Sequence, residues 1–100
     1  MSYRLVVTPA AEDDLLQAYS WYETKQLGLG TLFLESAEAV YERILEHPEL
    51  YQEVDEGIRR GVTRTFPYCI FYTLQENDII VLGIIDAAQD PDYIRSRWNV

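Results

Sequence analysis

Three of the chain's seven arginines, Arg59, Arg60 and Arg64, lie close together just before an aromatic run that extends from Phe66 to Tyr72. A guanidinium group donates paired hydrogen bonds that match the oxygens of a phosphate or a carboxylate. Arginines on a sheet that aromatic packing holds rigid would therefore form an anion-binding surface. We place the functional centre of the chain in this stretch.

Cleavage of RNA by its own 2′-hydroxyl needs a base, an acid and cations that stabilise the charged transition state. The candidates for a nuclease are Arg60 and Arg64 as cations, with Tyr93 as the best available tyrosine. The only lysine, Lys25, is predicted to lie away from the sheet. We expect no metal site and no cofactor, because one histidine and one cysteine do not make a metal site and no phosphate-binding glycine loop occurs.

Each candidate also has a structural interpretation. In a strand, the alternation of side chains would put Arg60 and Arg64 on one face, where they either pair with carboxylates of the helices or contact a partner. Near the C-terminus, arginines either cap the last helix or contact a target, and an exposed tryptophan would mark an interface. The candidate partner contacts are Arg59, Arg60, Arg64, Arg95, Arg97 and Trp98.

The net charge of −9 argues against indiscriminate nucleic-acid binding, which needs a basic surface. Residues 1–58 hold twelve acidic and three basic residues, whereas residues 59–100 hold five acidic residues and five arginines. No apolar run approaches the roughly 20 residues that span a bilayer, and the N-terminus is unlike a signal peptide. We predict one cytoplasmic domain, residues 1–100, that makes no membrane contact.

The expected fold is α+β. An N-terminal strand over residues 3–8 leads into a helix that Thr8 caps and Pro9 opens. Glycines 28 and 30 break this helix, and a second helix over residues 31–47 completes an antiparallel hairpin. After a loop over residues 49–57, a three-stranded antiparallel meander is predicted at residues 58–66, 68–75 and 79–87, with a short C-terminal helix at 91–98. The strand from 79 to 85 is apolar enough to be covered on both faces of one twisted sheet.

These elements and their motifs resemble the RelE/ParE superfamily, the plasmid-stabilisation toxins of type II toxin–antitoxin pairs. The resemblance covers nearly the whole chain. It is carried by T-P-A-A-E-D-D-L at residues 8–15, F-L at 33–34, I-L-E-H-P at 44–48, R-T-F-P-Y-C-I-F-Y at 64–72 and D-P at 90–91. It implies a twisted antiparallel sheet with the helix hairpin packed on one side.

The resemblance also implies growth inhibition, which a cognate antitoxin neutralises by wrapping the toxin. RelE-like members cleave mRNA on the ribosome, whereas ParE-like members inhibit DNA gyrase by binding it. Many members carry a histidine and an arginine at the end of the last long strand, where this chain has Asp86 and Gln89. A carboxylate and an amide cannot replace an imidazole and a cation beside phosphate, so the ParE-like branch is favoured.

Three hypotheses follow from the sequence. The first is a ParE-like toxin that binds gyrase and is not an enzyme. The second is a RelE-like ribosome-dependent endoribonuclease, and the third is an interaction module that keeps the fold without toxicity. All three predict an antitoxin partner, either in a toxin–antitoxin hetero-oligomer or beside a toxin homodimer.

Overall fold

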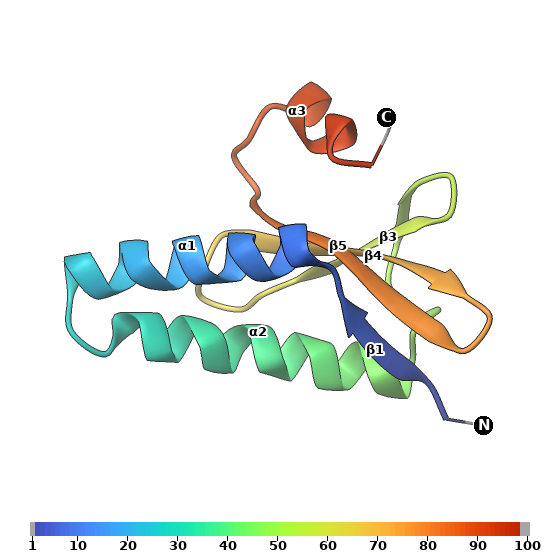
Figure 1. The fold of residues 1–100 in the computed structure, drawn as a ribbon, viewed down its shortest axis with the longest axis horizontal. Helices are drawn as coiled ribbons and strands as arrows, with labels where there is room; N and C mark the ends of the chain where they lie inside the picture. The colour runs from blue at the N-terminus through green and yellow to red at the C-terminus, as the bar shows by residue number, and fades with distance from the viewer. Residues whose placement is uncertain (1, 99–100) are drawn as a thin grey trace.

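The computed structural model describes residues 2–98 and shows two long helices packed on one side of a sheet, with a third, short helix beyond it (Figure 1). The elements follow in the order β1 (Arg4–Val7), α1 (Pro9–Lys25), α2 (Leu29–Glu46), β2 (Glu53–Asp55), β3 (Ile58–Val62), β4 (Tyr68–Gln75), β5 (Asp78–Asp86) and α3 (Pro91–Ser96). The predicted α+β class is confirmed.

Helix α1 begins as its sequence predicts. The side chain of Thr8 accepts a hydrogen bond from the main-chain N–H of Ala11 at 3.2 Å and donates one to the carbonyl of Val81 at 2.8 Å. Pro9 occupies the first turn, where the missing N–H costs nothing. The cap therefore both starts the helix and ties it to β5.

The two long helices approach closely where α2 begins. This helix starts at Leu29, so Gly30 lies inside it and does not break it, contrary to the prediction. A Cβ atom on Gly30 would lie 2.6 Å from a main-chain carbonyl oxygen of α1. The main-chain N–H of Gly30 donates to the carboxylate of Glu23 at 2.8 Å. Gly30 is thus needed for the contact between the helices.

The sheet has five strands in the order β1-β5-β4-β3-β2. Strands β3, β4 and β5 form the predicted antiparallel meander, β2 pairs antiparallel with β3, and β1 pairs parallel with β5. Strand β2 lies in the stretch that was predicted to be a loop. The all-antiparallel sheet that the resemblance implied is therefore corrected at one edge.

Strand β3 ends at Val62, four residues earlier than predicted. The hydroxyl group of Thr63 donates to the carbonyl of Phe66 at 2.7 Å, and Thr65 has a positive φ of 73°. This left-handed residue belongs to a turn, because non-glycine residues rarely adopt such a φ within a strand. The turn takes Arg64 out of the alternation of β3.

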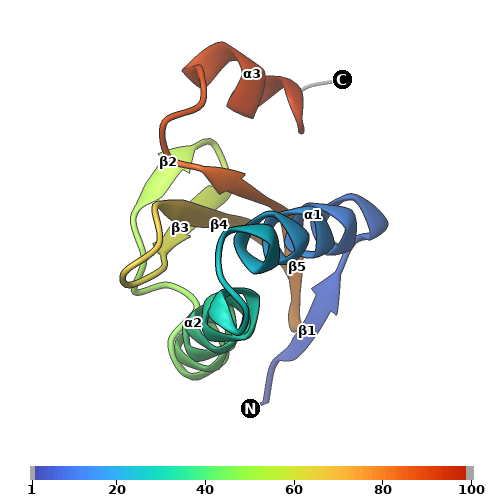
Figure 2. The ribbon, with the colours of Figure 1, turned by 90° about the vertical axis from the view of Figure 1, so that its left-hand side faces the viewer.

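Both faces of the sheet are covered, but unequally (Figure 2). The helix hairpin covers the main core, whose largest fully buried side chains include Tyr72, Phe33, Ile44 and Ile70. On the other face a smaller cluster of Ile58, Cys69, Phe71 and Ile85 packs against Ile94 and Trp98 of the C-terminal segment. Because β5 contributes to both clusters, its predicted coverage on two faces is confirmed.

Helix α3 begins at Pro91, as predicted, and the side chain of Asp90 caps it by accepting from the N–H of Asp92 at 2.8 Å. It ends at Ser96, two residues before the predicted end. Among residues 2–98, no helix combines the length and the apolar character that crossing a membrane requires.

Candidate functional site

Arg59 holds the loop that precedes β2. Its guanidinium group donates to the carbonyl oxygens of Tyr51 at 2.6 Å and Glu49 at 3.1 Å, and it lies 4.0 Å from the carboxylate of Glu53. These contacts engage N–H donors of the guanidinium group with acceptors of the same chain. The structure therefore gives Arg59 a structural role, whatever else it contacts.

Arg60 lies on the sheet face that α3 covers, opposite Phe71 in the β3–β4 register. It lines a cavity of about 200 Å³ together with Arg95, Ile94 and Trp98. We call this cavity the α3 cleft. Three of the six predicted partner contacts, Arg60, Arg95 and Trp98, thus come together there.

Trp98 forms part of the wall of the α3 cleft. Its ring lies 5.1 Å from that of Phe71, and its indole N–H donates to the carboxylate of Asp55 at 3.1 Å. That hydrogen bond is the main reason why the pKa of Asp55 lies below its ordinary value of 3.8. The predicted interface residue is therefore half-buried and joins the C-terminal segment to β2.

Arg64 lies elsewhere. The prediction that it shares a face with Arg60 is wrong, because β3 ends at Val62 and Arg64 lies in the turn that follows. Its carbonyl oxygen accepts a hydrogen bond from Ser36 of α2 at 2.9 Å. Arg64 also lines an apolar cavity of about 420 Å³ beside α2, where Leu32 and Phe66 contribute apolar surface.

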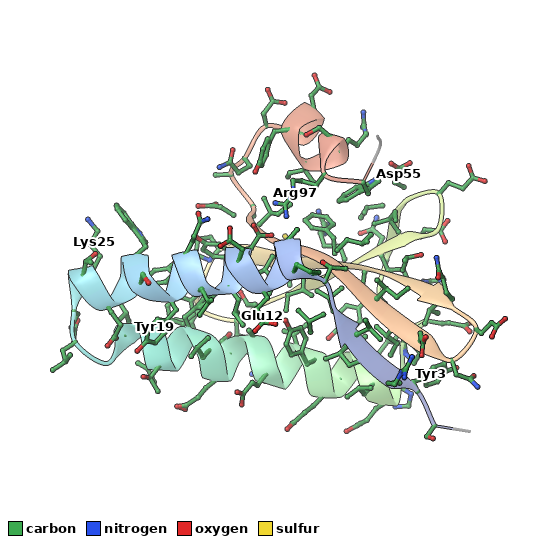
Figure 3. The ribbon with its side chains drawn as sticks, viewed as in Figure 1. Tyr3, Glu12, Tyr19, Lys25, Asp55 and Arg97 are labelled. Carbon is green, nitrogen blue, oxygen red and sulfur yellow. The ribbon has the colours of Figure 1, made fainter. Side chains whose placement is uncertain are left out.

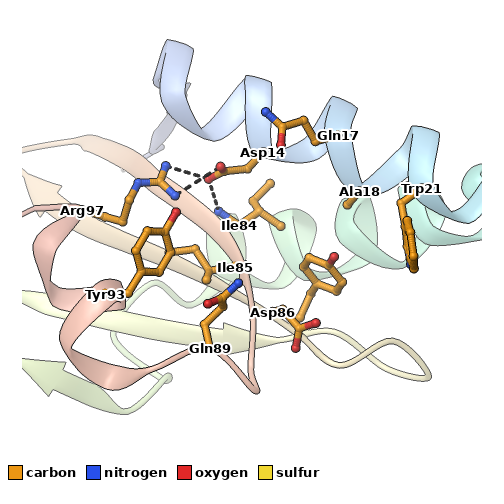
Figure 4. A pocket seen from close by; sticks show the side chains of 11 residues that line it. Asp14, Gln17, Ala18, Trp21, Ile84, Ile85, Asp86, Gln89, Tyr93 and Arg97 are labelled. Atoms are coloured by element: carbon orange, nitrogen blue, oxygen red, sulfur yellow. Dashed lines mark hydrogen bonds and ion pairs between the residues drawn. The ribbon is translucent and has the colours of Figure 1, made fainter.

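A further cavity, of about 340 Å³, opens where β5 ends (Figure 4). We call it the β5-end pocket. Helix α1 forms one wall, and the segment from β5 to α3 forms the other. Its lining residues are Asp14, Gln17, Ala18, Trp21, Tyr68, Ile84, Ile85, Asp86, Gln89, Tyr93 and Arg97. It contains both residues, Asp86 and Gln89, at which the chain departs from the superfamily pattern.

Arg97, the arginine among the described residues that line the β5-end pocket, is neutralised by Asp14. The two terminal nitrogens of the Arg97 guanidinium group donate to the Asp14 carboxylate oxygens at 2.8 and 3.2 Å, and the N–H of Ile84 donates to the same carboxylate at 3.0 Å. Only 16% of the Arg97 side chain and 18% of the Asp14 side chain are exposed. The hydrogen bond to Asp14 raises the pKa of Arg97 further. Figure 3 shows Arg97 pointing from the C-terminal segment toward α1.

Asp86 lacks such a partner. Its carboxylate accepts the N–H of Ala88 at 2.9 Å, and within residues 2–98 it forms no ion pair at 4.0 Å or less. The pKa of Tyr68 is raised, mainly by burial and also by the charges of Tyr22 and Asp86. The pKa of Tyr22 is raised by burial and then by Asp86. The pocket is thus acidic and aromatic, and the raised pKa of Tyr68 keeps this lining residue protonated at neutral pH.

The structure does not bring the three nuclease candidates together. Tyr93, with 46% of its surface exposed, lines the β5-end pocket, Arg60 lies in the α3 cleft, and Arg64 lies beside α2. Cation-assisted cleavage needs its groups around one phosphate. In this arrangement, the three candidate side chains do not surround a position that one phosphate could occupy.

Sequence reasoning missed Asp14, which organises the β5-end pocket. Asp14 lies within the T-P-A-A-E-D-D-L motif at residues 8–15, whereas its partner Arg97 is 83 positions away. Nothing in the sequence signals that pairing. In the described part of the chain, no three His, Cys, Asp or Glu side chains are grouped so as to hold a metal ion.

Three comparisons with known proteins agree with one another. The profile of a family described as the ParE toxin of type II toxin–antitoxin system, parDE, matches residues 5–91. Toxin ParE2 of two Mycobacterium tuberculosis strains, CDC 1551 / Oshkosh and ATCC 25618 / H37Rv, is 26% identical over 98 residues, which are 97% of this chain and 93% of the relative. A chain from the chromosomal ParDE TA system of P. aeruginosa has the same fold, with a TM-score of 0.76 at 15% identity. The match covers 85% of this chain and 96% of that one.

Proposed function

The chain belongs to the ParE toxin family of type II toxin–antitoxin systems, and from that premise we propose that it arrests growth by binding DNA gyrase in the cytoplasm. The observation that carries the proposal is the separation of Tyr93, Arg60 and Arg64 into three different surfaces. A toxin that acts by binding needs only an exposed surface, whereas a nuclease needs convergent groups.

The charge distribution supports this choice. An RNA-cleaving site must hold a polyanion, yet the β5-end pocket contains two carboxylates and one arginine that is already paired. The α3 cleft, by contrast, presents Arg60 and Arg95 beside Trp98. Arginine and tryptophan are enriched among the residues that dominate protein–protein binding. We therefore assign the target contact to the α3 cleft.

A cognate antitoxin is the second proposed partner. Several large apolar side chains on the helix hairpin are exposed, including Leu16, Trp21, Leu27 and Leu32. Leu16 and Trp21 line one cavity on α1, and exposed apolar patches mark interaction surfaces. An antitoxin that covers the hairpin would bury them, as expected for an antitoxin that neutralises the toxin by wrapping around it.

The test is induced expression in a bacterium, with pulse labelling of DNA synthesis and protein synthesis side by side. We expect DNA synthesis to stop first, and purified protein to inhibit gyrase supercoiling in vitro. Arg60→Ala should weaken inhibition by at least about tenfold, which corresponds to about 1.4 kcal/mol of binding. Arg4→Ala is the matched control, because Arg4 is an exposed arginine of β1 that pairs only with Asp78.

Two outcomes would contradict the proposal. If protein synthesis stops first and transcripts are cut, the chain is a nuclease and its groups must converge when it binds the ribosome. If folded protein accumulates without any effect on growth, the chain is an interaction module.

A further inference from the structure

The β5-end pocket contains one negative charge that nothing in the described chain compensates. Three formal charges line it, those of Asp14, Asp86 and Arg97. Asp14 and Arg97 neutralise each other through two hydrogen bonds. The remaining carboxylate, Asp86, has only a main-chain N–H for a partner. The pocket therefore has a net charge of about −1, set by one side chain.

The walls of the pocket are suited to a flat cation. Trp21, Tyr68 and Tyr93 line it, and aromatic faces attract cations because of their negative quadrupole. Gln89 adds an amide whose oxygen can accept a hydrogen bond. The indole of Trp21 already holds one cation, since the ammonium nitrogen of Lys25 lies 4.0 Å from its ring centroid.

We propose that the β5-end pocket binds the guanidinium group of an arginine side chain from a protein partner. The guanidinium plane stacks on an aromatic wall while its fork of N–H donors reaches the Asp86 carboxylate and the Gln89 amide oxygen. A planar, weakly hydrated guanidinium suits this site better than a compact ammonium. The volume of about 340 Å³ lies within the ~300–1,000 Å³ typical of ligand pockets.

Charge complementarity indicates why the partner is basic at this point. The chain has a net charge of −9, so a partner that covers it gains from positive side chains. Most acids on the helices are exposed to water and attract such a partner only weakly. Asp86 is half-buried and lies opposite Tyr68 in the β4–β5 register, where one ion pair is worth more than at the surface. The inference concerns this pocket alone and is independent of the toxin's target.

The experiment is an NMR titration of the full chain with N-acetyl-L-arginine methylamide. We expect saturable shifts of the Ala88 amide and the Trp21 indole N–H, with a Kd on the order of 1–10 mM for so small a probe. N-acetyl-L-citrulline methylamide, which is neutral and nearly isosteric, should bind at least about fivefold more weakly. The lysine analogue should also bind more weakly than the arginine analogue.

Two variants test whether the arginine probe binds through Asp86 or through the overall negative charge of the chain. Asp86→Asn keeps an acceptor for the Ala88 N–H, so the fold should survive, but it should reduce binding of the arginine probe at least about fivefold. Glu42→Gln removes the same charge from an exposed position of α2 and should leave binding unchanged. The proposal is overturned if no saturable shift occurs, if citrulline or lysine binds as well as arginine, or if Asp86→Asn still binds. Equal losses in both variants would also overturn it, since they would indicate nonspecific attraction.

Discussion

Replacing Asp14 should destabilise the protein more than replacing any other single acid of α1. Its carboxylate accepts two hydrogen bonds from Arg97 and one from the N–H of Ile84, and so joins α1, β5 and the segment after α3. A hydrogen bond to a charged group contributes about 1.5–3 kcal/mol, and the contributions of three bonds to one carboxylate do not add fully. We therefore expect Asp14→Ala to cost about 3 kcal/mol.

A double-mutant cycle isolates the ion pair from the main-chain bond. Asp14→Ala, Arg97→Met and the double variant are compared by urea unfolding, with the free energy of unfolding extrapolated to water. Because both side chains are mostly buried, we expect a coupling free energy of about 1.5–2 kcal/mol, above the 0–1 kcal/mol of exposed pairs. The melting temperature of Asp14→Ala should fall by about 12–24 °C, at 4–8 °C per kcal/mol for a domain of this size.

Asp13→Ala is the matched control. Asp13 is the preceding acid of the same helix, it is exposed, and its carboxylate accepts only from the Gln17 amide at 2.7 Å. Its loss should change stability by less than about 0.5 kcal/mol. A coupling free energy below about 0.5 kcal/mol between Asp14 and Arg97, or equal effects of the two alanine variants, would refute the reasoning.

Three other predictions follow from the packing. Burial raises the pKa of Tyr72 to about 12, and its hydroxyl group donates to the carbonyl of Pro48 at 2.6 Å. The native state thus keeps this proton between pH ~10 and ~12 while the unfolded chain loses it, so stability falls as the pH rises through that window. Tyr72→Phe should remove this part of the slope and cost about 1 kcal/mol at neutral pH, as measured by urea unfolding at several pH values. Gly30→Ala should destabilise by about 1–3 kcal/mol in the same assay, because the added methyl group meets main chain at 2.6 Å. A gain in stability, as helix propensity alone predicts, would contradict that packing. The pKa of Asp55 is lowered chiefly by the Trp98 indole, so this contact stabilises the fold above pH 3.8 and is lost as the pH falls through the native pKa. The indole N–H resonance of Trp98 should titrate in that acid range, and Asp55→Asn should abolish the titration.

Features of the sequence that act locally predicted much of the fold. Thr8 and Pro9 specify the start of α1 through their own backbone chemistry, and the cap at Asp90 does the same for α3. Strand β2 has no such signal, because two of its three residues are exposed and it exists by pairing with β3. The end of β3 was missed for a related reason. Phe66 suits a strand, but the hydrogen bonds of Thr63 make a turn there instead.

The candidate site was harder to predict, because the role of an arginine depends on which carboxylates and carbonyl groups surround it. Arg59 and Arg97 are equivalent to Arg60 by composition, yet both are held by internal acceptors. Arg60 forms no ion pair within residues 2–98, and Arg95 has only a contact of 3.9 Å with the exposed Asp92. Free arginines beside a tryptophan remain available to a partner, whereas the two held arginines stabilise the fold. Replacement of Arg97 should therefore lower the free energy of unfolding, whereas replacement of Arg60 should weaken binding to the target. Measuring stability and binding for each variant separates the structural arginines from the functional ones.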